Sequence, residues 1–199
     1  MTRVAIIDSG GANIASLRFA LARLGCEATL TREAAAIREA THVLLPGVGA
    51  AADAMERLRA AGLDTLIPAL YQPVLGICLG MQLLFSCSDE GPADCLGVFD
   101  DRVLAMEVGA NLPIPHMGWN RVFADADCPL FKGIADGDHF YFVHSYAVPV
   151  TDVTVATATY GAPFTAAAGR ANFLGTQFHP ERSGKAGARV LHNFLEMGQ

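Results

Sequence analysis

The chain has 199 residues, enough for one domain with a substantial core, and 52% hydrophobic against 17% charged residues argues against intrinsic disorder. Asp and Glu outnumber Lys and Arg by 20 to 14, and the net charge of −6 without a basic run argues against an electrostatic nucleic-acid binder. The five cysteines are odd in number, irregularly spaced and lack a CxxC pair, which indicates reduced thiols rather than a disulfide framework or a zinc site.

The sequence predicts no export signal and no membrane span. Only four apolar residues, 4–7, precede Asp8, which is too few for a signal peptide. Residues 65–88 carry no charge, but two prolines and two glycines interrupt them, which indicates a helix end, a buried strand and a tight turn. We therefore expect a cytoplasmic protein.

Short apolar runs and helical patterns alternate over the first 85 residues. Strands are predicted where apolar runs end at turn residues, at 4–7, 27–30, 42–45 and 74–77. Helices are predicted between and after them, at 14–24 with Asn13 as its cap, and at 33–39, 51–59, 63–70 and 79–85. This alternation predicts a parallel sheet with helices on both faces.

The second half of the chain changes to short runs between turns. Strands are predicted at residues 140–143, 146–148, 153–158, 164–168 and 173–177, and a last helix at 185–197. We find no linker, repeat or low-complexity tract. The sequence therefore predicts one α/β domain over residues 1–199, a three-layer open and mostly parallel sheet with an added antiparallel or mixed region.

Cys78 is the candidate nucleophile. Residues 76–80 read Gly-Ile-Cys-Leu-Gly at a predicted strand-to-helix junction, which is the pattern of a nucleophile elbow. The helix that begins at Leu79 would aim its free N–H groups and its dipole at the sulfur, which favours a thiolate. A free cysteine is often only a small core residue, and the other four cysteines, which do not stand between two glycines at a strand-to-helix junction, fit that role.

His179 is the candidate base. It follows an apolar strand in the run Gln-Phe-His-Pro-Glu-Arg, at the place where an α/β sheet carries its functional loops. Glu181 is close enough to orient the imidazole, so Cys78, His179 and Glu181 predict a triad of nucleophile, base and orienter. The alternative is a surface histidine beside a glutamate. No pair among the six histidines has metal-ligand spacing, so no metal site is expected.

Residues 46–49, Pro-Gly-Val-Gly, end a buried strand and form a candidate oxyanion loop. Two glycines allow a sharp turn that exposes N–H groups, and Leu79 could add a second donor if the loop lies beside Cys78. No Gly-Lys-Ser/Thr follows, which excludes a phosphate loop. An ordinary strand-to-helix loop is the alternative.

In their order of loop, elbow and His-x-Glu, these segments resemble the triad (class I) glutamine amidotransferases. Residues 115–120, Pro-His-Met-Gly-Trp-Asn, and 141–146, Tyr-Phe-Val-His-Ser-Tyr, are similar to the glutaminase subunits of imidazole glycerol phosphate synthase, an enzyme of histidine biosynthesis. The resemblance covers nearly the whole chain.

The resemblance implies that Cys78 attacks the side-chain amide of glutamine, and that Glu181 orients His179. His179 would give a proton to the departing ammonia and then activate water. The backbone N–H groups of Val48 and Leu79 would form the oxyanion hole. Four further residues would hold the amino and carboxylate ends of glutamine: Gly49, Gln82, Ser145 and Tyr146. No cofactor is implied.

The resemblance also implies a heterodimer. Ammonia would pass to a separate cyclase partner built as a (β/α)₈ barrel, which would make imidazole glycerol phosphate and an aminoimidazole carboxamide ribonucleotide. The residues expected near this partner are Asn13, Met117, Trp119, Asn120 and Arg182. Trp119 and its neighbours are expected in a loop rather than in a periodic element.

Three other functional classes remain as alternatives. A Cys-His hydrolase or an amidotransferase of another pathway is disfavoured by residues 115–120 and 141–146. A silent regulatory subunit is disfavoured by the intact triad. A structural Rossmann-like module is disfavoured because the first loop lacks the GxGxxG spacing.

Overall fold

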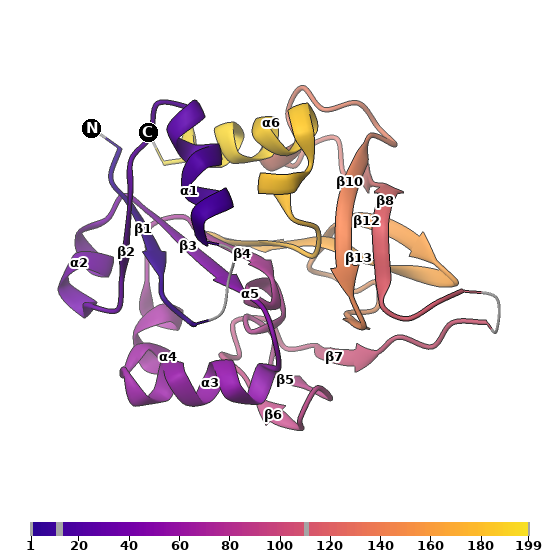
Figure 1. Cartoon of the computed structure of the whole chain (residues 1–199), viewed down its shortest axis with the longest axis horizontal. Helices are drawn as coiled ribbons and strands as arrows, with labels where there is room; N and C mark the ends of the chain where they lie inside the picture. Colours follow the sequence, from indigo (N-terminus) through magenta and orange to yellow (C-terminus); the bar gives the residue numbers. More distant parts are fainter. Residues whose placement is uncertain (1, 11–13, 110–111, 199) are drawn as a thin grey trace.

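The computed structural model describes residues 2–10, 14–109 and 112–198. Its centre is an eight-stranded mixed sheet (Figure 1). In spatial order the strands are β2 (Ala28–Thr31), β1 (Val4–Ile7), β3 (His42–Gly47), β4 (Val74–Cys78), β14 (Phe173–Thr176), β13 (Ala162–Arg170), β12 (Thr154–Tyr160) and β9 (Phe123–Ala124). The first five run parallel and the last three add antiparallel pairings, which confirms the predicted fold class.

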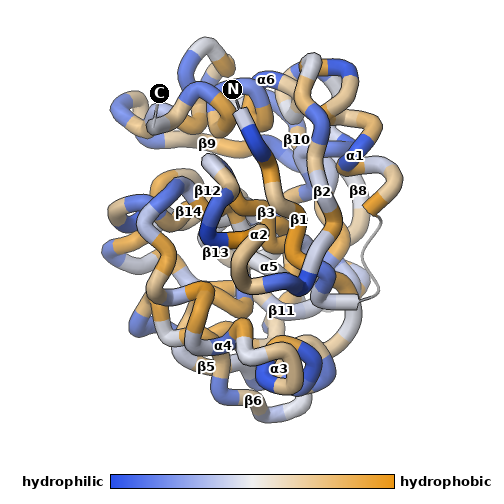
Figure 2. Tube along the Cα trace, turned by 90° about the vertical axis from the view of Figure 1, so that its left-hand side faces the viewer, coloured by the Kyte–Doolittle hydropathy of each residue, from blue (hydrophilic) through white to orange (hydrophobic). Residues whose placement is uncertain are grey.

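Helices cover both faces of this sheet (Figure 1). One face carries α1 (Ile14–Arg23) and α6 (Gly184–Leu195), and the other carries α2 (Ala34–Glu39), α3 (Ala51–Ala60) and α4 (Leu63–Leu66). Strand β1 explains the two cores, because successive side chains point to opposite faces. Val4 and Ile6 pack under α1 and α6, whereas Ala5 and Ile7 pack against α3. Figure 2 shows these apolar strands between the two helical layers.

Two smaller sheets lie beside the central one. Strands β8 (His116–Arg121) and β10 (His139–His144) form an antiparallel ribbon. The other sheet has the order β11 (Tyr146–Ala147), β7 (Arg102–Ala105), β5 (Cys87–Ser88) and β6 (Ala93–Asp94). Within the part of the chain that is described, no helix is long and apolar enough to cross a membrane.

The structure corrects two local predictions. The loop expected around Trp119 is wrong, because Trp119 lies on β8 and pairs with Tyr141 of β10. The exposed apolar side chains of this strand concealed its alternation of buried and exposed positions. The helix predicted over residues 79–85 is also too long: α5 (Leu79–Gln82) ends early and tight turns follow. The apolar run that follows reflects burial in the core rather than a helix.

Three neighbouring strands bring the candidate segments together. β3, β4 and β14 are adjacent and parallel, so their carboxyl ends meet at one edge of the sheet. Gly47 pairs with Cys78 across β3 and β4, and Thr176 pairs with Ile77 across β14 and β4. In an open α/β sheet this edge is where ligands bind.

Candidate active site

Cys78 ends β4 and is followed at once by α5, with φ 55° and ψ −114°. This backbone conformation is strained for a residue with a side chain. At the neighbouring positions 76 and 80 there is no room for any side chain. A Cβ on Gly80 would overlap the backbone oxygen of Leu45, and one on Gly76 would lie 2.6 Å from the Gly80 oxygen. The strand and the helix therefore approach closely only with glycine at both positions, and Cys78 takes the bend between them.

His179 and Glu181 follow β14, and Glu181 lies in a short 3₁₀ turn (Pro180–Arg182). The Nδ1 atom of His179 lies 2.9 Å from Oε1 of Glu181, and both side chains are buried. The backbone N–H of His179 donates to the carbonyl of Tyr141 at 2.9 Å, and the Ser183 hydroxyl donates to the His179 carbonyl at 2.7 Å. Two hydrogen bonds thus hold the backbone of His179, and Glu181 orients its imidazole. Its Nε2 has no hydrogen-bond partner in the described residues.

The charge state of His179 depends on two acidic neighbours. Burial acts to lower its pKa, but interactions with the Cys78 sulfur and with the Glu181 carboxylate together raise that pKa to about 10. His179 is therefore an imidazolium at neutral pH. Such a cation beside Cys78 suits a nucleophilic thiolate and leaves Nε2 with a proton to deliver.

A cavity of about 310 Å³ opens over Cys78. It is lined by every residue expected in the oxyanion hole or the glutamine site, together with the nucleophile and the base: Val48, Gly49, Cys78, Leu79, Gln82, Ser145, Tyr146 and His179. Glu181 lies behind the imidazole and outside this lining. The size suits a small molecule such as an amino acid.

Four residues of the cavity wall were not predicted: Glu90, Pro115, Val143 and His144. Glu90 supplies the one carboxylate of the described lining, and burial raises its pKa while a hydrogen bond from the Ala51 backbone lowers it. It follows β5 without any flanking motif, so no local signal marks it. His144 lies 2.9 Å from His116, a histidine pair that the sequence spacing did not reveal because β8 and β10 bring the two together.

The residues expected near a partner differ in exposure. Met117 and Trp119 are 66% and 56% exposed on the outer side of β8. The Trp119 ring lies edge-on to Tyr141 at 6.1 Å, and the Arg182 guanidinium lies over the same ring at 4.5 Å. Asn120 is half-buried and donates to the carbonyl of Thr159. Asn13 lies outside the described residues.

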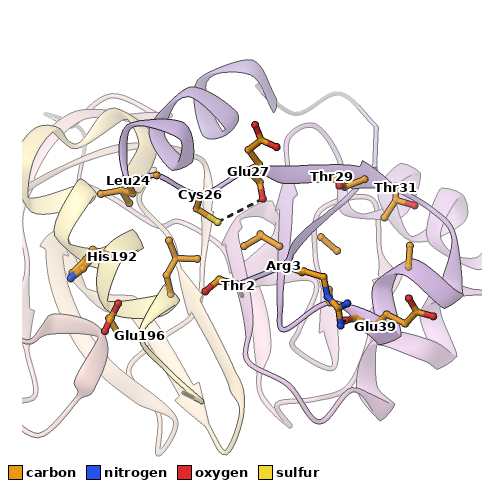
Figure 3. Close-up of a pocket in the computed structure, with 16 residues that line it drawn as sticks. Thr2, Arg3, Leu24, Cys26, Glu27, Thr29, Thr31, Glu39, His192 and Glu196 are labelled. Carbon is orange, nitrogen blue, oxygen red and sulfur yellow. Dashed lines mark hydrogen bonds between the residues drawn. The ribbon is translucent and has the colours of Figure 1, made fainter.

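A second cavity, of about 740 Å³, lies at the amino ends of β1 and β2 and extends to α6 (Figure 3). Cys26 in its wall donates to the carbonyl of Glu27 at 3.7 Å, and burial raises the pKa of this thiol. A thiol held in this way is a poor nucleophile. Among the described residues, no group of three or more His, Cys, Asp or Glu side chains is placed to hold a metal ion. The cavity over Cys78 is therefore the candidate active site.

The chain is similar to known proteins over nearly its whole length. The family model described as glutamine amidotransferase class-I matches residues 5–197. The chain is 52% identical over 197 residues to imidazole glycerol phosphate synthase subunit HisH of Xanthomonas axonopodis pv. citri (strain 306), covering 99% of this chain and 98% of that one. It is 49% identical over 201 residues to subunit HisH 1 of Vibrio vulnificus (strain YJ016), covering 98% of each.

Solved structures share the fold at low sequence identity. A structure described as a glutamine amidotransferase has a TM-score of 0.75 at 19% identity and covers 97% of both chains. A glutamine amidotransferase from Thermotoga maritima has a TM-score of 0.61 at 17% identity, covering 97% of this chain and 82% of that one. These likenesses concern the fold alone.

Proposed function

Since the chain belongs to the class I glutamine amidotransferase family, and within it to the HisH subunits of imidazole glycerol phosphate synthase, we propose that Cys78, His179 and Glu181 perform its glutaminase reaction. The protein is a subunit of a synthase of histidine biosynthesis and works with a partner subunit. The observation that carries the proposal is the strained Cys78 at the floor of a cavity whose wall holds a His179 bound to Glu181. Residues 1–199 form one amidotransferase domain in this proposal.

The first half-reaction forms a thioester. The Cys78 thiolate attacks the side-chain amide carbon of glutamine, and the carbonyl oxygen becomes an oxyanion held by the N–H groups of Val48 and Leu79. A backbone donor of this kind contributes roughly 3–4 kcal/mol to the transition state. The His179 imidazolium gives its Nε2 proton to the amide nitrogen, the carbon–nitrogen bond breaks, and ammonia leaves.

The second half-reaction consumes water. His179, now neutral, removes a proton from a water molecule that attacks the thioester carbon. The carbon–sulfur bond breaks, glutamate is released, and the thiolate and imidazolium are restored. Glu181 keeps Nδ1 protonated through the 2.9 Å hydrogen bond, so that Nε2 always faces the reacting atoms. The balance is one glutamine and one water to one glutamate and one ammonia.

The cavity wall offers partners for the two charged ends of glutamine. Gly49, Gln82, Ser145 and Tyr146 bind the amino and carboxylate ends in this proposal. Glu90 adds a carboxylate for the ammonium group, because a partly buried carboxylate pairs well with a cation.

The partner in this proposal is a (β/α)₈-barrel cyclase that receives the ammonia and makes imidazole glycerol phosphate and aminoimidazole carboxamide ribonucleotide. It docks on the outer face of the β8–β10 ribbon in a heterodimer. Exposed Met117 and Trp119 support this placement, with Arg182 beside them. Aromatic residues and arginine are enriched in interface hot spots. Asn13 and Asn120 complete the expected contact set.

The test replaces the nucleophile. We expect Cys78→Ser, in complex with the cyclase, to lose glutamine-dependent product formation, because a serine hydroxyl beside this base is a poorer nucleophile than a thiolate. The same complex should still form product from added ammonium salts. Glutamine-dependent turnover that survives in Cys78→Ser would contradict the proposal, as would labelling of Cys26 or Cys128 by a glutamine-like diazo-ketone.

A further inference from the structure

A buried histidine pair lies between the cavity and the ribbon. His116 begins β8 and His144 ends β10, and the two are directly paired across the strands. Nδ1 of His116 lies 2.9 Å from Nε2 of His144, with both side chains buried. The His116 ring stacks on Phe142 and on Tyr160, with centroids 5.0 and 4.1 Å away. Burying two titratable rings among aromatic side chains costs free energy unless their polar atoms are hydrogen-bonded. The hydrogen-bond partners of this pair therefore show what it is held against.

The hydrogen bonds of the pair run in one direction. Nδ1 of His144 lies 2.8 Å from the carbonyl oxygen of Tyr146, and a carbonyl can only accept, so this Nδ1 carries the proton. Nε2 of His144 therefore accepts from Nδ1 of His116. The Nε2 of His116 is left as an acceptor, and the amide nitrogen of Asn120 lies 3.3 Å from it. Burial lowers the pKa of both rings to about 4, which agrees with two neutral imidazoles.

The chain of hydrogen bonds continues to the nucleophile. The Tyr146 carbonyl also accepts from Nε2 of Gln82 at 2.9 Å, and the same Nε2 donates to Oε1 of Gln177 at 2.9 Å. Nε2 of Gln177 in turn lies 3.8 Å from the sulfur of Cys78. Gln82 ends α5, the helix that directly follows Cys78, and Gln177 lies two residues before His179. The Tyr146 carbonyl thus accepts hydrogen bonds from both His144 and Gln82, and so connects the histidine pair to the triad.

The other end of the hydrogen-bond network is Asn120, on the inner face of β8 next to Trp119. Asn120 donates to Thr159 at 2.9 Å with the same amide nitrogen that faces His116. On β8 the side chains of His116 and Asn120 point inward, and those of Met117 and Trp119 between them point outward. Because Trp119 and Asn120 are adjacent on β8, any shift of Trp119 along β10 moves Asn120 with it.

We propose that His116 and His144 are positioning residues for glutamine hydrolysis. They hold the Tyr146 carbonyl in a fixed position relative to β8. Through this carbonyl they also fix the positions of the cavity wall and of the nucleophile. The inference rests on the proposed glutaminase function. The pair touches no reacting atom. It acts by fixing the Tyr146 carbonyl, which is linked to β8 through the two histidines and to the elbow through Gln82. A partner that binds the ribbon therefore also sets the geometry at Cys78.

The experiment removes the pair without emptying its space. In His116→Phe/His144→Phe both polar rings are replaced by apolar rings, a change that can be nearly neutral for stability when both partners go together. We expect kcat for glutamine hydrolysis in the cyclase complex to fall roughly tenfold or more, because small displacements of reacting groups are expensive. Iodoacetamide should also alkylate Cys78 more slowly in the isolated chain. Ammonia-dependent product formation should stay at the wild-type rate.

His42→Phe is the matched control. His42 is a buried histidine that bonds to the Met197 carbonyl, far from the cavity, and burial lowers its pKa as well. It should lose stability without losing kcat. A double variant whose kcat and alkylation rate match those of His42→Phe would overturn the positioning role. If wild-type complex hydrolyses no glutamine, the proposed function fails instead, and the two failures are thereby distinguished.

A milder variant covers the case in which the double variant does not fold. Asn120→Ala removes only the outermost donor of the chain, and the readout is alkylation of Cys78 in the isolated protein, where no interface contributes. We expect roughly threefold slower alkylation, the equivalent of part of one hydrogen bond. An alkylation rate equal to that of the wild type would overturn the proposal.

Discussion

At the scale of single residues, the elbow requires a residue without a side chain at position 80. A Cβ there would overlap the backbone oxygen of Leu45, and backbone cannot rotate away as a side chain can. We expect Gly80→Ala to lower the free energy of unfolding by roughly 3 kcal/mol or more, the upper end for overpacking. Urea unfolding followed by circular dichroism measures it. Gly109→Ala, at a glycine with nothing within 4 Å of the added Cβ, is the control and should be neutral.

The same scale shows which site residues a sequence can reveal. Cys78, His179 and Glu181 stand out because their motifs are local, with flanking glycines in one case and a two-residue spacing in the other. Glu90 has no such neighbours, and it reaches the cavity only through the fold around β5. His116 and His144 are 28 residues apart and meet because two strands pair, which no spacing of histidines predicts.

At the scale of elements, sequence patterns predicted the buried strands and β10 of the ribbon, and missed β8. Strands β1, β3 and β4 are apolar at nearly every position because both faces of the sheet are covered. Strand β8 instead exposes Met117 and Trp119 and contains Gly118 at φ 137°, so it lacks the composition of a strand. An exposed apolar strand is better explained by a partner surface than by the chain's own core.

The exposed face of β8 gives a prediction for the single tryptophan of the chain. Trp119 is 56% exposed in the free protein, and docking of the cyclase on the ribbon would remove it from water. We expect its fluorescence emission to shift to shorter wavelength when the cyclase is added to saturation. A tryptophan-free cyclase variant keeps the signal assignable. An emission spectrum that is unchanged at saturation would place the interface elsewhere.

At the scale of the whole molecule, buried histidines with opposite pKa shifts bound the stable pH range. His116 and His144 have pKa values lowered to about 4 from 6.5, so between these values the unfolded chain binds protons that the folded chain excludes. Stability is therefore full above pH 6.5 and falls as the pH drops toward 4. The pKa of His179, raised to about 10, has the opposite sign. Its contribution is full below pH 6.5 and is lost as the pH rises toward 10.

These signs predict a free energy of unfolding that peaks near pH 6.5 and falls on both sides. Each histidine contributes at most about 1.4 kcal/mol per pH unit to the slope. His116 and His144, together with His42, whose pKa burial also lowers, therefore make the acid side steeper than the alkaline one. Urea unfolding at a series of pH values, followed by circular dichroism, measures both slopes. The His116→Phe/His144→Phe variant should flatten the acid side alone, and His179→Ala should flatten the alkaline side alone. An acid slope that is equal in the wild type and the double variant would mean that the two rings are already protonated in the folded protein. That outcome would contradict the hydrogen bonds described above, in which both rings are neutral.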